Sequence, residues 1–354
     1  MIIDKTLRII DANFNRLIEA IRVLEEISRF ILNDKLLSAK LKNIRSSIKD
    51  EILKIYKGDD LVSSRDSKND VGRTFYTKSE SNRESIYSII TSNLKRGQEA
   101  SRVLEEFTKL TSKSTGKFFK NIRFKLYELE KTFAKTELIS NKKEKLDFDL
   151  YVVTDPDVLS KKPIIKAVQD AIEGGAKIVQ FRDKKCSMKE YYQTAKKLSI
   201  LCKKLGAVFI VNDHIDICLA VDADGIHLGQ DDIPIKVARK ILGDDKIIGL
   251  STHSFEQAMN GLKSGADYIS IGPIFQTPSK PNSKNLGIPL LKKIANNIKK
   301  SNKPLPFAAI GGINETNINS VAKITKKIAV IRAVFGKNNI KKAVKTLRRS
   351  IFKR

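Results

Sequence analysis

The sequence contains few cysteines and no long apolar run. Its three cysteines, Cys186, Cys202 and Cys218, are widely spaced and form no Cys-X-X-Cys pair. This argues against a disulfide framework and against a thiolate zinc site, so we interpret them as packing residues. No apolar run approaches the roughly 18 residues that span a bilayer, and the N-terminal stretch lacks the apolar core of a signal peptide. We therefore expect a cytoplasmic protein with no membrane partner.

Patterns for covalent and transition-metal catalysis are also missing. There is no His-X-X-X-His or His-Cys pattern for a transition metal, and no convincing Ser-His-Asp or Cys-His set. We interpret the three histidines, His214, His227 and His253, as structural rather than as general bases. This favours catalysis by positioning and charge stabilisation.

Acidic residues are outnumbered by basic ones. The chain has 40 Asp and Glu against 67 Lys and Arg, a net charge of +27. Because the basic residues are spread along helical segments and are not interleaved with aromatic ones, we do not expect specific nucleic-acid binding. Attraction of anionic substrates is the simpler explanation, although a general lysine bias without function also fits. With 354 residues the chain is long enough for two domains, each with its own core.

The N-terminal part contains an internal repeat. NFNRLIEAIRVLEE at 13–26 recurs as NLKRGQEASRVLEE at 93–106, and KNIR at 42–45 recurs at 120–123. Apolar residues at three- and four-residue steps predict amphipathic helices, so we expect a duplicated helical domain. The repeated charges are interpreted most simply as a paired network where the two related helices meet.

Two further segments of this part are distinctive. The polar segment 63–85 suits a functional loop, but it has no glycine-rich phosphate-binding P-loop. The lysine-rich segment 136–146 is predicted to be a linker, which gives a helical domain over 1–135 and a second domain over 147–354.

The second domain alternates strand-like and helix-like segments. Its expected strands are DLYVVTD, KIVQFRD, VFIVND, GIHLGQ, IIGLS, YISIGPIF, PFAAIGGI and AVIRAVF. Eight parallel strands with intervening helices predict a TIM barrel, the α/β class, whose active site lies at the carboxyl ends of the strands. An open doubly wound sheet is the alternative.

Acidic residues close two neighbouring strands of this barrel. Asp213 follows the third strand and Asp232 follows the fourth, with Asn212 and Gln230 beside them. Neighbouring parallel strands lie about 4.8 Å apart, so the two carboxylates can share one ion. Mg²⁺ suits such a pair, because it usually takes one or two protein carboxylates and leaves positions for substrate phosphates. Capping of the following helices is the alternative for either residue alone.

Basic residues and glycines close other strands. After the second strand, Arg182 and Lys184 point the same way and can grip phosphate, whereas Asp183 leans the other way. After the sixth strand, Lys280 follows a polar loop. Gly312 and the loop after the eighth strand predict a second phosphate site, at backbone N–H groups ahead of helices. Two anion sites across one barrel mouth indicate a diphosphate substrate and a separate monophosphate substrate.

Several short motifs occur in an order and spacing that resemble those of a known protein family. QFRDK, VND, DGIHLGQDD, GLSTH, GPIFQTPSK and IGGI resemble the thiamine-phosphate synthase family over the whole barrel. DANFNRLIEAIRVLEEISRF, RDSKNDVG and the second RVLEE resemble the helical hydroxymethylpyrimidine-phosphate kinase domain found fused ahead of such synthases.

The resemblance implies a transferase that joins hydroxymethylpyrimidine diphosphate to thiazole phosphate. It implies catalytic roles for Arg182, Lys184, Ser251 and Lys280, and one Mg²⁺ per barrel on Asp213 and Asp232. The substrate-binding residues that it implies are Gln180, Phe181, Arg182, Asp183, Lys184, Asn212, Ser251, Thr277, Pro278, Ser279, Lys280, Gly312, Ile331 and Arg332. Arg332 stands where a serine is common in the family, whose contacts there are made largely by backbone groups, so thiazole phosphate is still expected to bind.

Several alternatives stay open at this point. The barrel could resemble the related thiazole tautomerases, although the intact QFRDK, Asp213 and Asp232 argue against this. The N-terminal domain is either a kinase that uses ATP or a non-catalytic oligomerisation module, and a homo-oligomer remains open.

Overall fold

The computed structural model describes residues 2–65, 83, 85–159, 162–278, 284–302 and 304–353. The chain divides into two compact units, Met1–Ile139 and Ser140–Arg354. Among the described residues, no helix combines the length and the apolar character that crossing a membrane requires.

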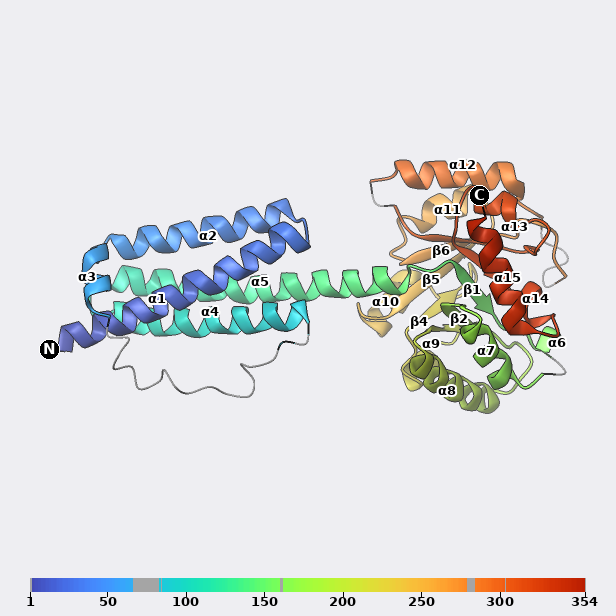
Figure 1. Ribbon diagram of the computed structural model, residues 1–354, viewed down its shortest axis with the longest axis horizontal. Helices are drawn as coiled ribbons and strands as arrows, with labels where there is room; N and C mark the ends of the chain where they lie inside the picture. The colour runs from blue at the N-terminus through green and yellow to red at the C-terminus, as the bar shows by residue number, and fades with distance from the viewer. Residues whose placement is uncertain are drawn as a thin grey trace. The chain divides into compact units, whose positions relative to one another are not determined.

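The first unit is helical (Figure 1). Its elements are α1 (Ile2–Glu26), a π-helical turn η1 (Ile27–Ile31), α2 (Lys35–Leu53), α3 (Gly58–Ser63), α4 (Ile86–Thr108) and α5 (Lys113–Lys145). The side chain of Asp34 accepts from the N–H of Leu37 and so caps α2, and Ser85 forms a capping box at the start of α4. α5 is continuous to Lys145, so most of the predicted linker 136–146 is helical.

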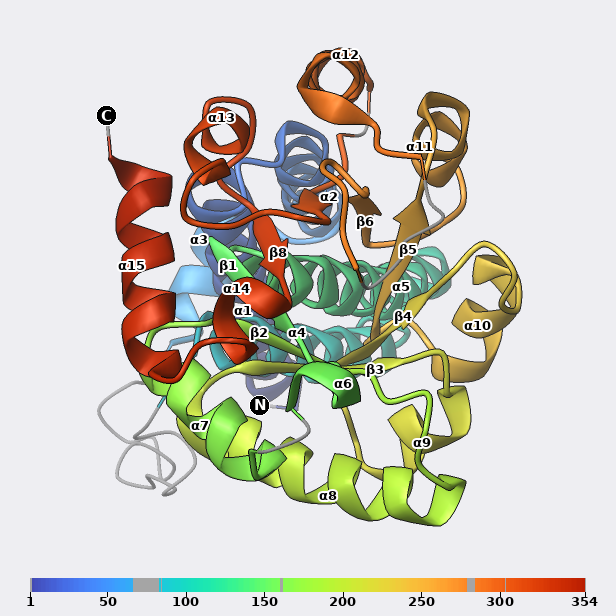
Figure 2. The ribbon, with the colours of Figure 1, turned by 90° about the vertical axis from the view of Figure 1, so that its right-hand side faces the viewer.

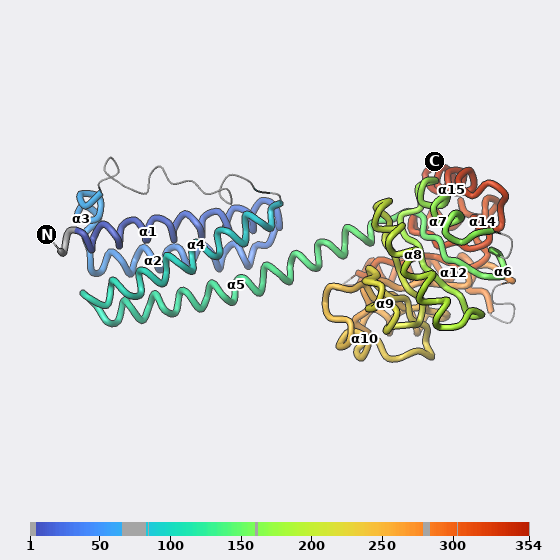
Figure 3. The backbone as a smooth tube through the Cα atoms, turned by 90° about the horizontal axis from the view of Figure 1, so that it is seen from below, coloured from blue at the N-terminus to red at the C-terminus, as the bar shows by residue number. Residues whose placement is uncertain are grey.

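The duplication is visible in this unit, where α1 packs against α4 and α2 (Figure 3). α1 and α4 carry the two copies of the first repeat, and α2 and α5 carry the two copies of KNIR. Arg45 Nε lies 2.9 Å from Glu25 Oε2, and Arg123 Nη2 lies 2.9 Å from Glu105 Oε2. These ion pairs join α1 to α2 and α4 to α5. They therefore lie within each copy, not between α1 and α4, where we expected them.

The second unit is a closed parallel barrel of eight strands in sequence order. The strands are β1 (Leu150–Val153), β2 (Ile178–Phe181), β3 (Val208–Asn212), β4 (Gly225–Leu228), β5 (Ile247–Thr252), β6 (Tyr268–Ile271), β7 (Phe307–Ile310) and β8 (Ile328–Val330). β8 pairs with β1 and closes the barrel, with Leu150 opposite Ile328. The predicted TIM barrel is confirmed and the open sheet is excluded.

Helices surround the strands (Figure 2). They are α6 (Pro156–Leu159), α7 (Ile164–Glu173), α8 (Met188–Leu205), α9 (Ile215–Ala220), α10 (Ile235–Leu242), α11 (Phe255–Gly261), α12 (Gly287–Lys300), α13 (Ile318–Ala322), α14 (Arg332–Phe335) and α15 (Ile340–Phe352). The final strand is shorter than expected, because β8 ends at Val330 and Arg332 already begins α14.

Alternation along the strands divides the apolar side chains between two cores. Val152, Val179 and Ile226 belong to the core between strands and helices, whereas Tyr151 and Tyr268 belong to the core inside the barrel. Buried strands with both faces covered are typical of parallel sheets. The inner core supports the residues that reach the carboxyl ends of the strands.

Candidate active site

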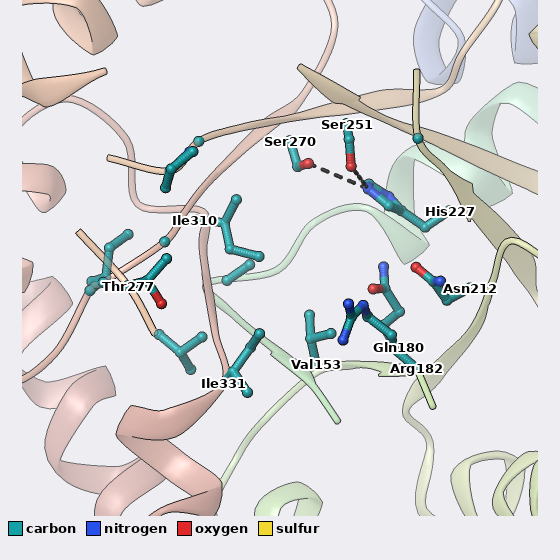
Figure 4. A pocket seen from close by; sticks show the side chains of 18 of the residues that line it. Val153, Gln180, Arg182, Asn212, His227, Ser251, Ser270, Thr277, Ile310 and Ile331 are labelled. Atoms are coloured by element: carbon teal, nitrogen blue, oxygen red, sulfur yellow. Dashed lines mark hydrogen bonds between the residues drawn. The ribbon is translucent and has the colours of Figure 1, made fainter. Parts of the chain in front are cut away.

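A cavity of about 440 Å³ opens at the carboxyl ends of the barrel strands (Figure 4). Residues from the ends of all eight strands, or from the loops that follow them, line it. Because TIM-barrel enzymes carry their active sites at this face, this cavity is the candidate active site.

Most of the predicted site residues meet at this cavity. Those that line it are Gln180, Arg182, Lys184, Asn212, Asp213, Asp232, Ser251, Thr277, Pro278, Gly312, Ile331 and Arg332. Ser279 and Lys280 lie outside the described residues. Residues from distant parts of the sequence are thus brought together on the expected face of the barrel.

Two predicted substrate-binding residues, Phe181 and Asp183, do not line the cavity. The ring of Phe181 is buried against Tyr191, with the ring centroids 4.4 Å apart. Asp183 Oδ1 accepts the backbone N–H of Lys185 at 2.8 Å and so shapes the loop. Alternate residues of an extended segment point to opposite sides, so Gln180, Arg182 and Lys184 face the cavity while these two face away.

Asp213 and Asp232 form a carboxylate pair in the cavity. The backbone of Asp213 is left-handed, with φ at 63°, and its N–H donates to the carbonyl of His227 at 3.0 Å. Asp232 Oδ2 accepts the N–H of Gly229 at 2.6 Å. Burial, the charge of Asp232 and a hydrogen bond between the two carboxyl groups raise the pKa of Asp213. Two carboxylates held this closely repel each other, which favours a cation between them.

The donor set of this pair fits Mg²⁺ better than a transition metal. Within the described ranges, no group of three or more His, Cys, Asp or Glu side chains could hold a metal ion. Mg²⁺ needs only one or two protein carboxylates, because water and substrate phosphate complete its shell. Asp213 and Asp232 are therefore suited to hold it.

Two cationic side chains, those of Arg182 and Lys184, line the cavity. Lys184 Nζ lies 3.6 Å from Asp213 Oδ2, and Arg182 Nη1 lies 3.9 Å from Asp155 Oδ2. Thr154 clamps the backbone of Arg182, because its Oγ1 accepts the N–H of Arg182 at 2.9 Å and donates to the carbonyl at 3.0 Å. These two bonds fix the backbone of Arg182 at the end of β2, and its guanidinium, which lines the cavity, can meet a phosphate group there.

Glycines shape the part of the cavity after β7. Gly312 is left-handed with φ at 67°, and a Cβ there would lie 2.5 Å from the carbonyl oxygen of Gln276 and 2.8 Å from Phe275 Cβ. Asn317 Nδ2 donates to the carbonyl of Gly312 at 2.9 Å. The loops after β6 and β7 therefore pack closely, and only glycine fits between them. Ile331 and Arg332 line the neighbouring part of the cavity.

Sequence reasoning missed a set of polar residues at the base of the cavity. Tyr151, His227 and Ser270 line the cavity together with Gln180 and Ser251, and hydrogen bonds connect the side chains of His227, Ser251 and Ser270 (Figure 4). His227 was interpreted as structural because it lies within a strand. The available signal was the alternation along β4, which turns His227 inward.

These features define a class: a TIM-barrel enzyme whose cavity combines a carboxylate pair with cationic side chains and a glycine loop. Residues 150–334 match the family profile described as thiamine monophosphate synthase, and residues 8–132 match that of the ThiD2 family. A thiamine-phosphate synthase of Synechocystis sp. is 38% identical over 94% of this chain and 92% of its own. One of Prochlorococcus marinus is 40% identical over 93% and 92%.

A solved structure supports the same assignment for the barrel. The thiamine phosphate pyrophosphorylase of Pyrococcus furiosus is 39% identical, with a TM-score of 0.53, over 58% of this chain and 96% of that chain. The chain belongs to the thiamine-phosphate synthase family, a family of transferases, and carries an N-terminal region that matches the ThiD2 family.

Proposed function

We propose that the barrel joins hydroxymethylpyrimidine diphosphate to thiazole phosphate and releases diphosphate and thiamine phosphate. Family membership supports this reaction. The observation that carries the proposal is that one cavity combines two sets of residues suited to anions. Arg182, Lys184 and the carboxylate pair line it, with Lys184 beside Asp213, and Gly312, Ile331 and Arg332 line it as well. A diphosphate and a monophosphate would bind to these two sets.

The reaction breaks the bond between the pyrimidine methylene carbon and the diphosphate oxygen, and its electron pair leaves with the oxygen. Arg182 and Lys184 would stabilise the negative charge that grows on this oxygen. Mg²⁺ held by Asp213 and Asp232 would add positive charge to the diphosphate. The thiazole nitrogen then supplies the electron pair of the new carbon–nitrogen bond, so no protein nucleophile is required.

The remaining predicted residues would position the two rings. Gln180, Asn212 and Ser251 would hold the aminopyrimidine diphosphate, together with Lys280. Thr277, Pro278, Ser279, Gly312 and the Ile331–Arg332 pair would bind the thiazole phosphate. Holding two reactants at a fixed distance accounts for a large share of such a rate enhancement. The full carboxylate and cation set also favours this reaction over thiazole tautomerisation, which releases no diphosphate.

For the N-terminal unit we propose phosphorylation of hydroxymethylpyrimidine monophosphate by ATP, which would supply the diphosphate that the barrel consumes. The match of residues 8–132 to the ThiD2 family supports this activity. A non-catalytic oligomerisation module is the second candidate.

The proposal is tested with the full chain, Mg²⁺ and thiazole phosphate, supplying the pyrimidine either as diphosphate or as monophosphate with ATP. Thiamine phosphate from both mixtures is expected. The Asp213→Asn variant separates the two activities, because it should accumulate pyrimidine diphosphate from ATP while making thiamine phosphate much more slowly. Product from the diphosphate alone would reduce the N-terminal unit to a structural role, and product from neither would refute the proposed function.

A further inference from the structure

A chain of hydrogen bonds crosses the interior of the barrel at the cavity. Gln180 Nε2 donates to Tyr151 Oη at 2.6 Å, and Tyr151 Oη lies 2.9 Å from Tyr268 Oη. Tyr268 Oη lies 2.8 Å from His227 Nδ1. His227 Nε2 lies 2.9 Å from Ser251 Oγ, a contact that Figure 4 shows. We call these residues the polar chain. They come from five different strands, and both ends of the chain line the cavity.

The direction of the polar chain follows from its first donor. An amide nitrogen can only donate, so Tyr151 accepts from Gln180 and its own proton goes to Tyr268. The proton of Tyr268 then goes to His227 Nδ1. Burial raises the pKa of both tyrosines, so both hydroxyl groups keep their protons.

The far end of the chain is fixed in the same way. An imidazole that accepts at Nδ1 carries its proton on Nε2. This N–H of His227 donates to Ser251 Oγ at 2.9 Å, with Ser270 Oγ as a more distant neighbour at 3.4 Å. With this amide orientation, a chain running in the opposite direction would place the hydroxyl proton of Tyr151 against Gln180 Nε2, which cannot accept it. Buried polar groups are rarely left without partners, so the amide orientation of Gln180 and the direction from Gln180 to Ser251 go together.

We propose that Tyr151, Tyr268 and His227 are positioning residues that hold this chain in one direction, so that Gln180 presents its amide carbonyl and Ser251 its hydroxyl proton to the pyrimidine substrate. The inference rests on the proposed synthase function. The sequence did not predict a role for Tyr151, Tyr268 or His227 in the site. In this proposal they determine which hydrogen bonds Gln180 and Ser251 can make with the substrate.

The direction of the chain has a consequence for substrate choice. The amino group of the aminopyrimidine can donate to the carbonyl of Gln180, whereas an oxo analogue would place a carbonyl oxygen against it. A site built for one donor–acceptor pattern rejects the opposite pattern, because its buried polar groups are then left unpaired. The polar chain thus selects the amino compound.

Tyr268→Phe tests this selection. Without the hydroxyl of Tyr268, Tyr151 is free to donate to Gln180 once the amide turns over, and the amide nitrogen can then face the cavity. We expect kcat/KM for the aminopyrimidine diphosphate to fall about tenfold and the preference over the oxo analogue to fall by a similar factor. Tyr191→Phe is the matched control, because Tyr191 is a buried tyrosine on α8 that donates to the carbonyl of Phe181 at 2.8 Å, outside the chain.

The direction itself is measured without turnover, by nitrogen NMR of the full chain labelled in its three histidines. The signals of His227 are assigned by their loss in His227→Gln. We expect the wild type and Tyr191→Phe to carry the proton on Nε2, and Tyr268→Phe to lose this preference. A proton on Nδ1 of His227 in the wild type would overturn the inference. It would also be overturned if Tyr268→Phe and Tyr191→Phe preferred the aminopyrimidine over the oxo analogue to the same extent. Because the NMR result does not depend on synthase activity, a failure of the proposed function leaves it readable.

Discussion

Lys184 Nζ lies 3.6 Å from Asp213 Oδ2, although the two residues follow different strands of the barrel. Burial and the neighbouring Asp232 raise the pKa of Asp213, while the charge of Lys184 acts in the opposite direction. The carboxylate pair is therefore a place where added positive charge is favourable. The same lysine can reach a phosphate group that is drawn to this part of the cavity.

Replacing Asp213 by Asn should remove metal binding and lower turnover by roughly a hundredfold or more. Asn tolerates the left-handed backbone of this position better than Ala does, so the change isolates the loss of charge. Mg²⁺ binding is measured by isothermal titration calorimetry and folding by circular dichroism. Asp216→Asn, at an exposed residue in the first turn of α9, is the control. Wild-type Mg²⁺ affinity in the Asp213 variant would contradict the metal assignment.

Replacing Arg182 by Gln should lower kcat by about a hundredfold, because a cation beside the leaving diphosphate would be lost. Lys185→Gln is a close control, since Lys185 lies three residues further along the chain and pairs with Asp157 instead of lining the cavity. Steady-state kinetics with saturating thiazole phosphate compares the two. Equal losses would mean that general positive charge, and not the position of Arg182, matters.

Replacing Gly312 by Ala should raise KM for thiazole phosphate by about tenfold, since the new Cβ would push the loops after β6 and β7 apart. The control is Gly206→Ala. Gly206 has a similar φ of 70°, but a Cβ there meets nothing within 4 Å. Both variants carry the backbone strain of about 1 kcal/mol, which thermal melting measures. An unchanged KM in the Gly312 variant would remove this loop from the thiazole site.

The barrel and most of its cavity were predictable because parallel strands repeat a simple pattern. Polar residues or glycines follow most of the strands, so Arg182, Asp213 and Gly312 could be assigned to one face from the sequence alone. Alternation also explains why Asp183 points away from that face. Alternation also turns His227 inward, but the contacts of His227 and Tyr268 could not be predicted, because one buried polar residue in a strand does not reveal which residues it meets across the barrel.

The helical unit shows a different limit of sequence reasoning. The repeat predicted two related helices and their charges, but not which helices the charges join. Glu25 and Glu105 pair with arginines of KNIR from the following helix of the same copy. Which arginine each glutamate meets depends on how the two helices of a copy pack together. The spacing of residues within one helix contains no information about that packing.

Acid should weaken the helical unit through Glu105. Burial alone would raise the pKa of Glu105, but hydrogen bonds from Arg123 and Arg102 outweigh it and hold the pKa below its ordinary value of 4.5. Its contribution to folding is therefore present above that ordinary value and is lost as the pH falls through the lowered pKa.

Glu105→Gln should reduce the free energy of unfolding by about 1–3 kcal/mol at neutral pH and flatten its dependence on pH in the acid range. Urea unfolding, followed by circular dichroism between neutral and acid pH, measures both effects. Glu106→Gln, at the neighbouring half-exposed residue, should reduce the free energy of unfolding much less. If the two variants lose stability equally, the buried pair with Arg123 is not what stabilises this end of α4.

Thiamine phosphate formation by the full chain from hydroxymethylpyrimidine diphosphate and thiazole phosphate with Mg²⁺ tests the synthase activity of the barrel. Thiamine phosphate and released diphosphate are both quantified by chromatography. We expect the two products in equal amounts, and roughly a hundredfold less of both from the Asp213→Asn variant. A folded wild-type chain that forms no thiamine phosphate, or that only hydrolyses the diphosphate substrate, would contradict the proposed synthase activity.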